Sequence, residues 1–205
     1  MSISRTTGQL CTTTAAAKQT PDLPDAALIQ SIAADDKHAM QILFARHNVR
    51  VFRFLLRFVG DKSAAEDLVS DVFLDVWRQA GGFQARSQVP TWLLAIARNK
   101  ALSALRRRST EELDEDAAGA IEDPQDDPEV TLQSRQKTGI MLNCLTRLSP
   151  AHREVIDLVY YHEKSTDEVA EIIGVPQNTV KTRMFYARKQ IAELMAVQGI
   201  DRAIK

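Results

Sequence analysis

Three aspartates lie at four-residue intervals in the stretch A-E-D-L-V-S-D-V-F-L-D-V-W, residues 65–77. In a helix Asp67, Asp71 and Asp75 stack on one face, where like charges repel by roughly 0.2–0.5 kcal/mol per pair. A catalytic carboxylate pair or a metal site would need a histidine or a second acidic helix nearby, and the sequence offers neither. Two interpretations stay open: a solvated helix face, or a surface for a protein partner that is itself basic.

A second group of residues has the chemistry to read duplex DNA. The segment 174–191, G-V-P-Q-N-T-V-K-T-R-M-F-Y-A-R-K-Q-I, opens on a glycine turn and continues with apolar residues at helical spacing. Short hydroxyls and an arginine on the opposite face can contact the edges of DNA bases in a major groove. The lysine and arginine residues that flank them can contact phosphates. The glycine turn and the basic face together favour DNA binding over an ordinary amphipathic helix with a solvated side.

A third group, within 83–108, suits unpaired nucleotides. Phe83 and Trp92 bracket a loop, and the helix that follows turns Arg98, Asn99 and a run of arginines outward. Basic groups beside aromatic rings bind single strands, the charge holding the backbone and the rings the bases. Two blander interpretations stay open, because Trp92 has the character of a core residue and an arginine run is typical of a solvated helix end.

The elements that must position these groups are all predicted to be helical. Eight glycines in 205 residues and the scarcity of alternating apolar patterns argue against strands. We expect helices near 25–34, 37–59, 64–80 and 90–108, and a second set near 131–148, 150–162, 166–173 and 177–197. Local signals place their ends: Gly60 and Gly174 stop helices, Ser149-Pro150 starts one, and Ser63 and Ser165 each open a capping box.

The charge is segregated along the chain although the net charge is only -1. Residues 26–108 carry 13 basic and 7 acidic residues, and residues 130–205 carry 11 and 8, whereas residues 109–129 carry 10 acids and no base. Such a stretch cannot fold by itself, so we expect an extended acidic linker between two small helical domains, 25–108 and 130–198. Residues 1–24 have the composition of a disordered tail.

Several other classes of protein are disfavoured. No apolar run is long enough for a membrane span, and the N-terminus has no apolar core of the signal-peptide kind. Cys11 and Cys144 form no disulfide framework, which fits a cytoplasmic protein, and the four scattered histidines predict no metal site.

Taken in order, four stretches of the chain resemble an extracytoplasmic-function sigma factor, the small two-domain branch of the bacterial sigma-70 family. They are F-R-F-L-L-R-F-V-G-D-K-S-A-A-E-D-L-V-S-D-V-F-L-D-V-W, T-W-L-L-A-I-A-R-N-K-A-L, L-S-P-A-H-R-E-V-I-D-L-V-Y-Y and G-V-P-Q-N-T-V-K-T-R-M-F-Y-A-R. The resemblance covers nearly everything from about residue 25 to 196. The usual V-K-S-R reads V-K-T-R here, which keeps the hydroxyl.

The resemblance implies an all-α protein with a sigma region 2 bundle, a linker and a region 4 helix-turn-helix. It also implies no catalytic residue and no cofactor, because the polymerase does the chemistry. Core RNA polymerase would bind through its beta-prime clamp helices and its beta flap, and promoter DNA would bind both domains. The residues implied at the clamp helices are Glu66, Asp67, Asp71, Leu74 and Asp75.

The implied DNA contacts fall in two sets. Those for the melted minus-10 element are Phe83, Trp92, Arg98, Asn99, Lys100, Ser103, Arg106 and Arg107. Those for the minus-35 duplex are Gln177, Asn178, Thr179, Lys181, Thr182, Arg183, Tyr186 and Arg188.

The family also implies a regulator, because an anti-sigma factor commonly covers both domains until a stress signal arrives. Two alternatives are a sigma mimic that titrates an anti-sigma factor and a stand-alone helix-turn-helix repressor. A mimic should lose the basic residues that contact DNA, which this chain keeps. A repressor would not need the acidic linker or the aspartate stripe.

Overall fold

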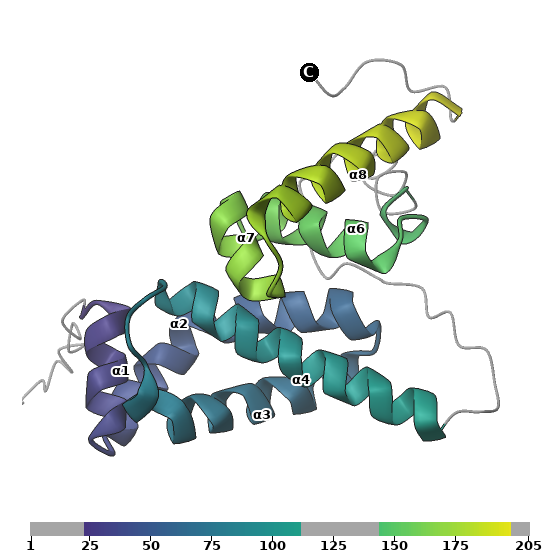
Figure 1. The fold of residues 1–205 in the computed structure, drawn as a ribbon. Coiled ribbons are helices and arrows are strands. Elements are labelled where there is room, and N and C mark those ends of the chain that lie inside the picture. The colour runs from purple at the N-terminus through teal and green to yellow at the C-terminus, as the bar shows by residue number, and fades with distance from the viewer. Residues whose placement is uncertain (1–22, 112–143, 198–205) are drawn as a thin grey trace, which may run out of the picture.

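The computed structural model describes residues 23–111 and 144–197, which we call the N-terminal lobe and the C-terminal lobe. The predicted all-α class is confirmed, since every regular element within these ranges is a helix (Figure 1). Most of the predicted tail, most of the acidic linker and the beginning of the helix predicted over 131–148 lie outside the described residues. The linker was predicted to begin at residue 109, but the helix before it continues to Glu111.

The N-terminal lobe is a bundle of four α-helices, α1 (Asp25–Ala33), α2 (Lys37–Val59), α3 (Lys62–Gln79) and α4 (Val89–Glu111), with one 3-10 turn, η1 (Ala80–Gly82). The long helices α2, α3 and α4 all pack on one another, and α1 crosses one end of the bundle (Figure 1). Each turns an apolar stripe inward, so that Leu43, Phe54, Val72 and Leu93 are fully buried. In α3 the buried apolar residues include Leu68, Val69, Val72, Phe73 and Val76, which form part of the core.

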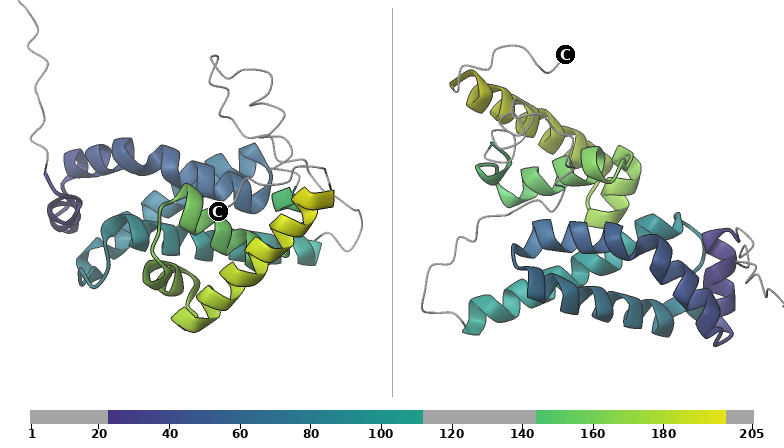
Figure 2. Two further views of the ribbon diagram at one scale, coloured as in Figure 1. Left: turned by 90° about the horizontal axis from the view of Figure 1, so that it is seen from above. Right: turned by 180° about the vertical axis from the view of Figure 1, so that it is seen from behind.

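The C-terminal lobe contains α6 (Pro150–Ile156), a π-helical segment η2 (Asp157–Tyr161), α7 (Thr166–Ile173) and α8 (Gln177–Val197). The pair α7 and α8, joined by a turn at Gly174, has the helix-turn-helix arrangement that the sequence predicts. This lobe lies across the N-terminal bundle, with α7 packed against α4 (Figures 1 and 2).

Most of the predicted helix ends are confirmed by their hydrogen bonds. Gly60 and Gly174 adopt left-handed φ angles of 72° and 75°, which glycine tolerates best. Ser149 caps α6, and Ser165 forms the expected reciprocal capping box with Glu168.

Two local predictions were wrong. Helix α3 is capped by Asp61, whose carboxylate accepts from the Ala64 amide at 2.8 Å, and not by Ser63. A carboxylate is as good a cap as a hydroxyl, and its earlier position makes the helix begin two residues before the predicted start. The single helix predicted over 150–162 instead widens into the π-helical η2 from Asp157 onward, a distortion that often accompanies function.

Within the two described lobes, no helix combines the length and the apolarity that crossing a bilayer requires. The same residues contain no cluster of histidine, cysteine, aspartate or glutamate able to hold a metal ion.

Candidate nucleic-acid interface

Helix α3 presents an acidic face to solvent. Glu66, Asp67 and Asp71 are exposed there, and Asp67 and Asp71 have no ion pair within the described residues. Glu66 has only a loose contact, with Lys62 at 4.0 Å, and both of those side chains are largely exposed. The helix therefore keeps the repulsion of its neighbouring carboxylates, which a basic partner would turn into attraction.

The last aspartate of the stripe is held differently. The Asp75 carboxylate lies 2.8 Å from the Lys100 ammonium on α4 and 3.8 Å from Arg78. Both Asp75 and Lys100 are only partly exposed. The sequence assigned Asp75 to a protein partner and Lys100 to DNA, whereas here the two neutralise each other between α3 and α4.

Apolar side chains lie beside the acidic face. Leu74, also expected at the partner surface, is 46% exposed. Phe44 on α2 is 41% exposed and packs edge-on against Phe73, with ring centroids 4.8 Å apart. Leu74 was predicted at a protein-binding surface, whereas Phe44 was not, and both leave apolar area exposed to solvent.

The aromatic pair predicted to meet unpaired bases comes from two neighbouring elements: Phe83 lies in the loop between η1 and α4, and Trp92 lies in the first turn of α4. Phe83 and Trp92 are in contact, with ring centroids 4.9 Å apart. Both rings are partly buried against the core, so each has a structural role as well. A hollow of about 510 Å³ opens beside Phe83, lined by Arg86, Ser87 and Gln88 among others. Ala85 takes a positive φ of 52° in this loop, a strained conformation of the kind found at binding sites.

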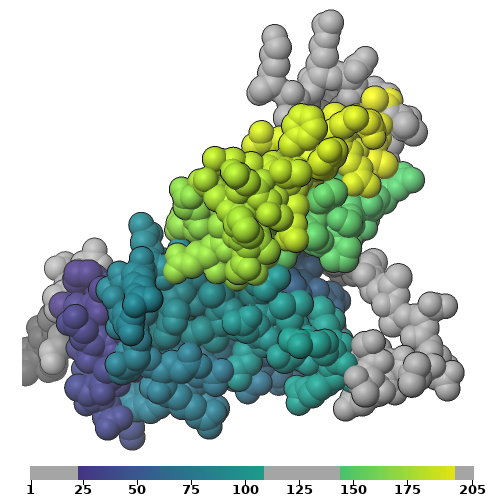
Figure 3. All heavy atoms as spheres, in the orientation of Figure 1, coloured from purple at the N-terminus to yellow at the C-terminus, as the bar shows by residue number. Residues whose placement is uncertain are grey.

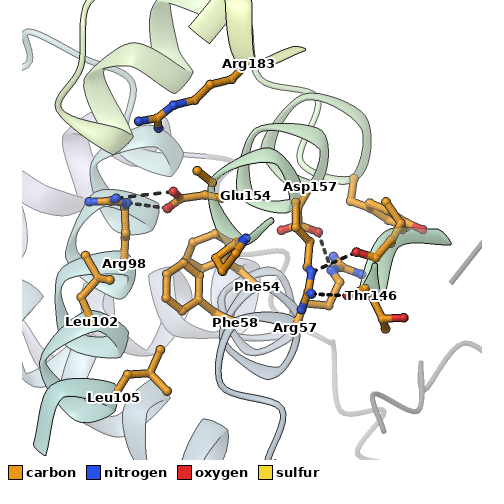
Figure 4. Close-up of a pocket in the computed structure, with 15 residues that line it drawn as sticks. Phe54, Arg57, Phe58, Arg98, Leu102, Leu105, Thr146, Glu154, Asp157 and Arg183 are labelled. Carbon is orange, nitrogen blue, oxygen red and sulfur yellow. Dashed lines mark hydrogen bonds and ion pairs between the residues drawn. The ribbon is translucent and has the colours of Figure 1, made fainter. Parts of the chain in front are cut away.

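The outward face of α4 divides into two parts. Asn99, Ser103, Arg106 and Arg107 are exposed, as the single-strand interpretation requires. Arg98 is not: its guanidinium makes two contacts with the Glu154 carboxylate of the C-terminal lobe, and only 17% of its side chain is exposed (Figure 4).

Helix α8 leaves most of its predicted duplex-reading residues at the surface. Asn178, Lys181, Thr182, Tyr186 and Arg188 are exposed. Thr179 and Gln177 are partly buried, and Gln177 donates a hydrogen bond to Thr166 at 3.2 Å. Arg183 extends into the space between the lobes, where it lines the same cavity as Arg98 (Figure 4).

The structure also brings forward aromatic residues that the sequence analysis did not select. Phe185 is 65% exposed on α8, where it contacts the ring of Tyr186. Phe185 and Tyr160 line a shallow groove together with Lys181, Arg188 and Lys189. The signal was present in the sequence, because Phe185 falls outside the apolar positions 180, 184, 187, 191 and 194 that α8 buries or half-buries.

The lobes are joined by a buried polar network that sequence reasoning did not find. The Lys164 ammonium donates to Thr91 Oγ1 at 2.9 Å and to Glu168 Oε1 at 2.7 Å, and Thr91 Oγ1 donates to the same carboxylate oxygen at 2.7 Å. Thr91 is fully buried and Lys164 almost so. Partial burial acts to raise the pKa of Glu168, but the hydrogen bonds from Lys164, Thr91 and the Ser165 amide outweigh it and lower that pKa to about 2.

Comparison with known proteins matches both lobes to one family. Residues 43–111 match Sigma-70 region 2, and residues 138–191 match Sigma-70, region 4. The chain is 31% identical over 168 residues to the RNA polymerase sigma factor CarQ of Myxococcus xanthus, covering 80% of this chain and 94% of CarQ. It is 29% identical over 163 residues to the ECF RNA polymerase sigma factor SigK of Mycobacterium sp. (strain KMS), covering 77% and 83%.

Two solved structures share the fold. The sigma factor RpoE from Bartonella quintana, in a co-crystal with the anti-sigma factor NepR, aligns with a TM-score of 0.66 and 25% identity, over 79% of this chain and 98% of that one. CnrH, in complex with the cytosolic domain of CnrY, aligns with a TM-score of 0.63 and 22% identity, over 84% and 97%.

Proposed function

The chain belongs to the extracytoplasmic-function branch of the sigma-70 family, and from that premise we propose that it directs core RNA polymerase to promoters by binding a minus-35 duplex and a melted minus-10 element. The observation that carries the proposal is the coexistence of three separate surfaces. One is the acidic face of α3, one is the basic and aromatic face around Phe83 and α4, and one is the exposed face of α8. The family acts in transcription initiation, and we assign this chain no catalytic step.

Polymerase is proposed to bind the acidic face of α3. Asp67 and Asp71 carry uncompensated charge within the described residues, and Leu74 adds exposed apolar area. Opposite charge on the polymerase clamp helices would steer association, and the apolar side chains would add affinity. The beta flap is the proposed partner of the C-terminal lobe.

The minus-35 element is proposed to lie against the first half of α8. We assign Thr182 and Arg183 to base edges, and Lys181 and Arg188 to phosphates. Phe185 joins this set, because an exposed aromatic ring among basic residues suits apolar contact with a thymine methyl group.

The minus-10 element is proposed to bind as a single strand. The hollow beside Phe83 has polar groups on its wall and room for an unpaired base, and the exposed arginines of α4 would hold the backbone. Promoter melting then needs no chemical step by this protein. Binding energy for unpaired bases shifts the duplex equilibrium toward the open form.

We further propose that a cytoplasmic anti-sigma factor holds the protein inactive until a stress signal arrives. The similarity to RpoE, a sigma factor solved in complex with its anti-sigma factor, supports this.

Reconstituted transcription tests the proposal. Purified chain is mixed with core polymerase and a library of promoter fragments, and the transcripts are sequenced. We expect a discrete set of promoters that share a minus-35 and a minus-10 sequence. Core polymerase that starts no specific transcript with this chain would contradict the proposal. Tight, promoter-specific binding by the chain without polymerase would favour a stand-alone repressor.

A further inference from the structure

A cavity of about 420 Å³ lies between the two lobes, and none of the three proposed surfaces includes its interior. The C-terminal lobe rests on the N-terminal bundle, so the cavity takes its walls from both lobes (Figure 3). Small-molecule sites in proteins have volumes of about 300–1,000 Å³, with mostly apolar walls and a few polar groups that fix the ligand. The size of this cavity therefore suits a small organic molecule.

One wall of the cavity is apolar. Phe54 and Phe58 on α2 and Leu102 and Leu105 on α4 form it, and we call these four residues the apolar wall (Figure 4). Phe54 is fully buried, whereas the other three are only partly buried and so keep apolar area that nothing in the described residues covers. A ligand with an apolar body would gain free energy by covering that area.

The charged groups of the cavity have an excess of positive charge. Among the described residues that line it are four arginines and two carboxylates. Arg57 pairs with Asp157, and Arg98 pairs with Glu154, so two of the arginines are neutralised. The two arginines that remain make the cavity more favourable for an anion than for a neutral molecule or a cation.

Those two arginines differ in the donors that they leave free. Arg153 donates to three backbone carbonyl groups of the C-terminal lobe, the shortest at 2.7 Å. Arg183 is partly buried, and across residues 23–111 and 144–197 it has neither a hydrogen bond nor an ion pair. Figure 4 shows its side chain extended toward the Arg98–Glu154 pair. A guanidinium with free donors beside an apolar surface is well suited to a carboxylate, which accepts two parallel hydrogen bonds from it.

The free guanidinium also limits the charge of the ligand. A phosphate monoester carries nearly two negative charges and three strong acceptor oxygens, and Arg183 alone cannot satisfy them. A carboxylate carries one negative charge and two oxygens, which match the two parallel N–H groups of one guanidinium. The cavity therefore favours a monocarboxylate.

We propose that this cavity is a binding site for a small organic monocarboxylate, which pairs its charged group with Arg183 and lays an apolar body against the apolar wall. The site itself requires neither promoter nor polymerase. One consequence rests on the proposed function, because Arg183 is also assigned to a base edge of the minus-35 element. A bound carboxylate takes the donors that the base would need, so ligand and promoter compete for this residue.

Isothermal titration calorimetry of the full chain with decanoate tests the site. Decanoate is ionised at neutral pH and has an apolar chain, and we expect saturable one-to-one binding. Decanol has the same chain without the charge. It should bind at least about tenfold more weakly, because it forms no charge-assisted hydrogen bonds with Arg183.

Matched variants locate the ligand. Arg183→Gln should weaken decanoate binding by about tenfold and leave decanol binding unchanged, a difference that a general loss of structure would not produce. Arg147→Gln makes the same change at an exposed position that does not line the cavity, and it should bind decanoate like the wild type. Leu105→Trp places a larger ring on the apolar wall and should abolish binding of both compounds. Val49→Trp, at an exposed position of α2, should not.

Four results would each overturn the proposal: no saturable binding of decanoate, equal affinities for decanoate and decanol, full decanoate affinity in Arg183→Gln, or full affinity in Leu105→Trp. Circular dichroism checks that both variants are folded. Transcription from a selected promoter, with and without decanoate, tests the competition. If decanoate binds as expected but transcription is unchanged, the site stands and the competition is refuted. Failure of the promoter selection would refute the proposed function and leave the calorimetry to decide the site.

Discussion

This chain uses carboxylates in two different environments, one exposed to solvent on α3 and one paired with basic side chains at or beside the contact between the lobes. On α3, Asp67 and Asp71 stay exposed and repel each other. In the C-terminal lobe, Glu154, Asp157 and Glu168 each contact a basic side chain, across the lobe contact or beside it. The first group leaves its charge unpaired within the described residues, whereas the second is paired at or beside the contact between the lobes.

The same contrast occurs within the aspartate stripe. Asp71 is exposed, whereas Asp75, one turn further along α3, is neutralised by Lys100 at 2.8 Å. Spacing alone treats these residues as equivalent, because they share a helix face. Their environments assign Asp71 to the surface and Asp75 to the contact between α3 and α4.

The largest expected effect comes from reversing the exposed group. Asp67→Arg with Asp71→Arg should abolish assembly with core polymerase, because like charges brought together across an interface cost several kcal/mol. Co-purification with core polymerase measures this, and circular dichroism checks the fold. Asp167→Arg with Glu171→Arg, the same change at the same spacing on exposed positions of α7, is the matched control for the clamp contact. Undiminished assembly by the α3 variant would remove polymerase docking from this face.

The next effect concerns Arg183, which borders the cavity between the lobes and also belongs to the proposed duplex-reading face of α8. Arg183→Ala should weaken binding of the polymerase complex to its minus-35 sequence by about 1–3 kcal/mol if the guanidinium reads a base. Competition between matched and mutated promoter duplexes measures the loss. Lys189→Ala changes an exposed basic residue that lines the groove beside Phe185 and Tyr160, and it should weaken binding to all duplex sequences by the same amount. An equal loss on every duplex for Arg183→Ala would make it a phosphate contact.

A smaller effect separates the two neighbouring aspartates. Asp75→Asn should lower the free energy of unfolding by about 1–2 kcal/mol, because it leaves the partly buried Lys100 without its partner. Asp71→Asn should leave the fold as stable or slightly more so, since it relieves repulsion along α3. Urea denaturation of the two variants decides the point. Equal stability losses would mean that the two carboxylates have the same environment.

The last prediction concerns a pH dependence of Glu168. Its pKa is lowered from 4.5 to about 2 by Lys164, Thr91 and the Ser165 amide, against the opposing effect of partial burial. A lowered pKa means that the carboxylate stabilises the folded protein fully above pH 4.5, and that this contribution is lost as the pH falls toward 2. The difference in unfolding free energy between wild type and Glu168→Gln should therefore shrink as the pH is lowered below 4.5. A difference that stays constant across that range would show that the charge of Glu168 does not stabilise the fold.

Sequence reasoning succeeded where the cause of a structure is local. Gly60, Gly174 and the Ser165 capping box end or start helices through hydrogen bonds within a few residues, and all three were predicted. The failure at Ser63 was also local, since Asp61 offered an equivalent cap two residues earlier. The π-helical η2 has no comparable signal in the sequence. Its Asp157 pairs with Arg57 of the other lobe, and His162, the residue after η2, packs against Phe54 there.

The partners of charged residues could not be predicted in the same way. Arg98 was predicted to be exposed from its place on α4, and its contact with Glu154 joins residues 56 positions apart. Thr91 and Lys164 are separated by 73 positions. Periodicity gives the face on which a side chain lies, but not whether another part of the chain covers that face.

The measurement that tests the central claim most directly is promoter melting by the reconstituted complex. Permanganate oxidises unpaired thymines, so it reports whether the chain makes polymerase open the minus-10 region. With a selected promoter, we expect reactive thymines there only when core polymerase and this chain are both present. A reactivity pattern identical to that of core polymerase alone would contradict the account.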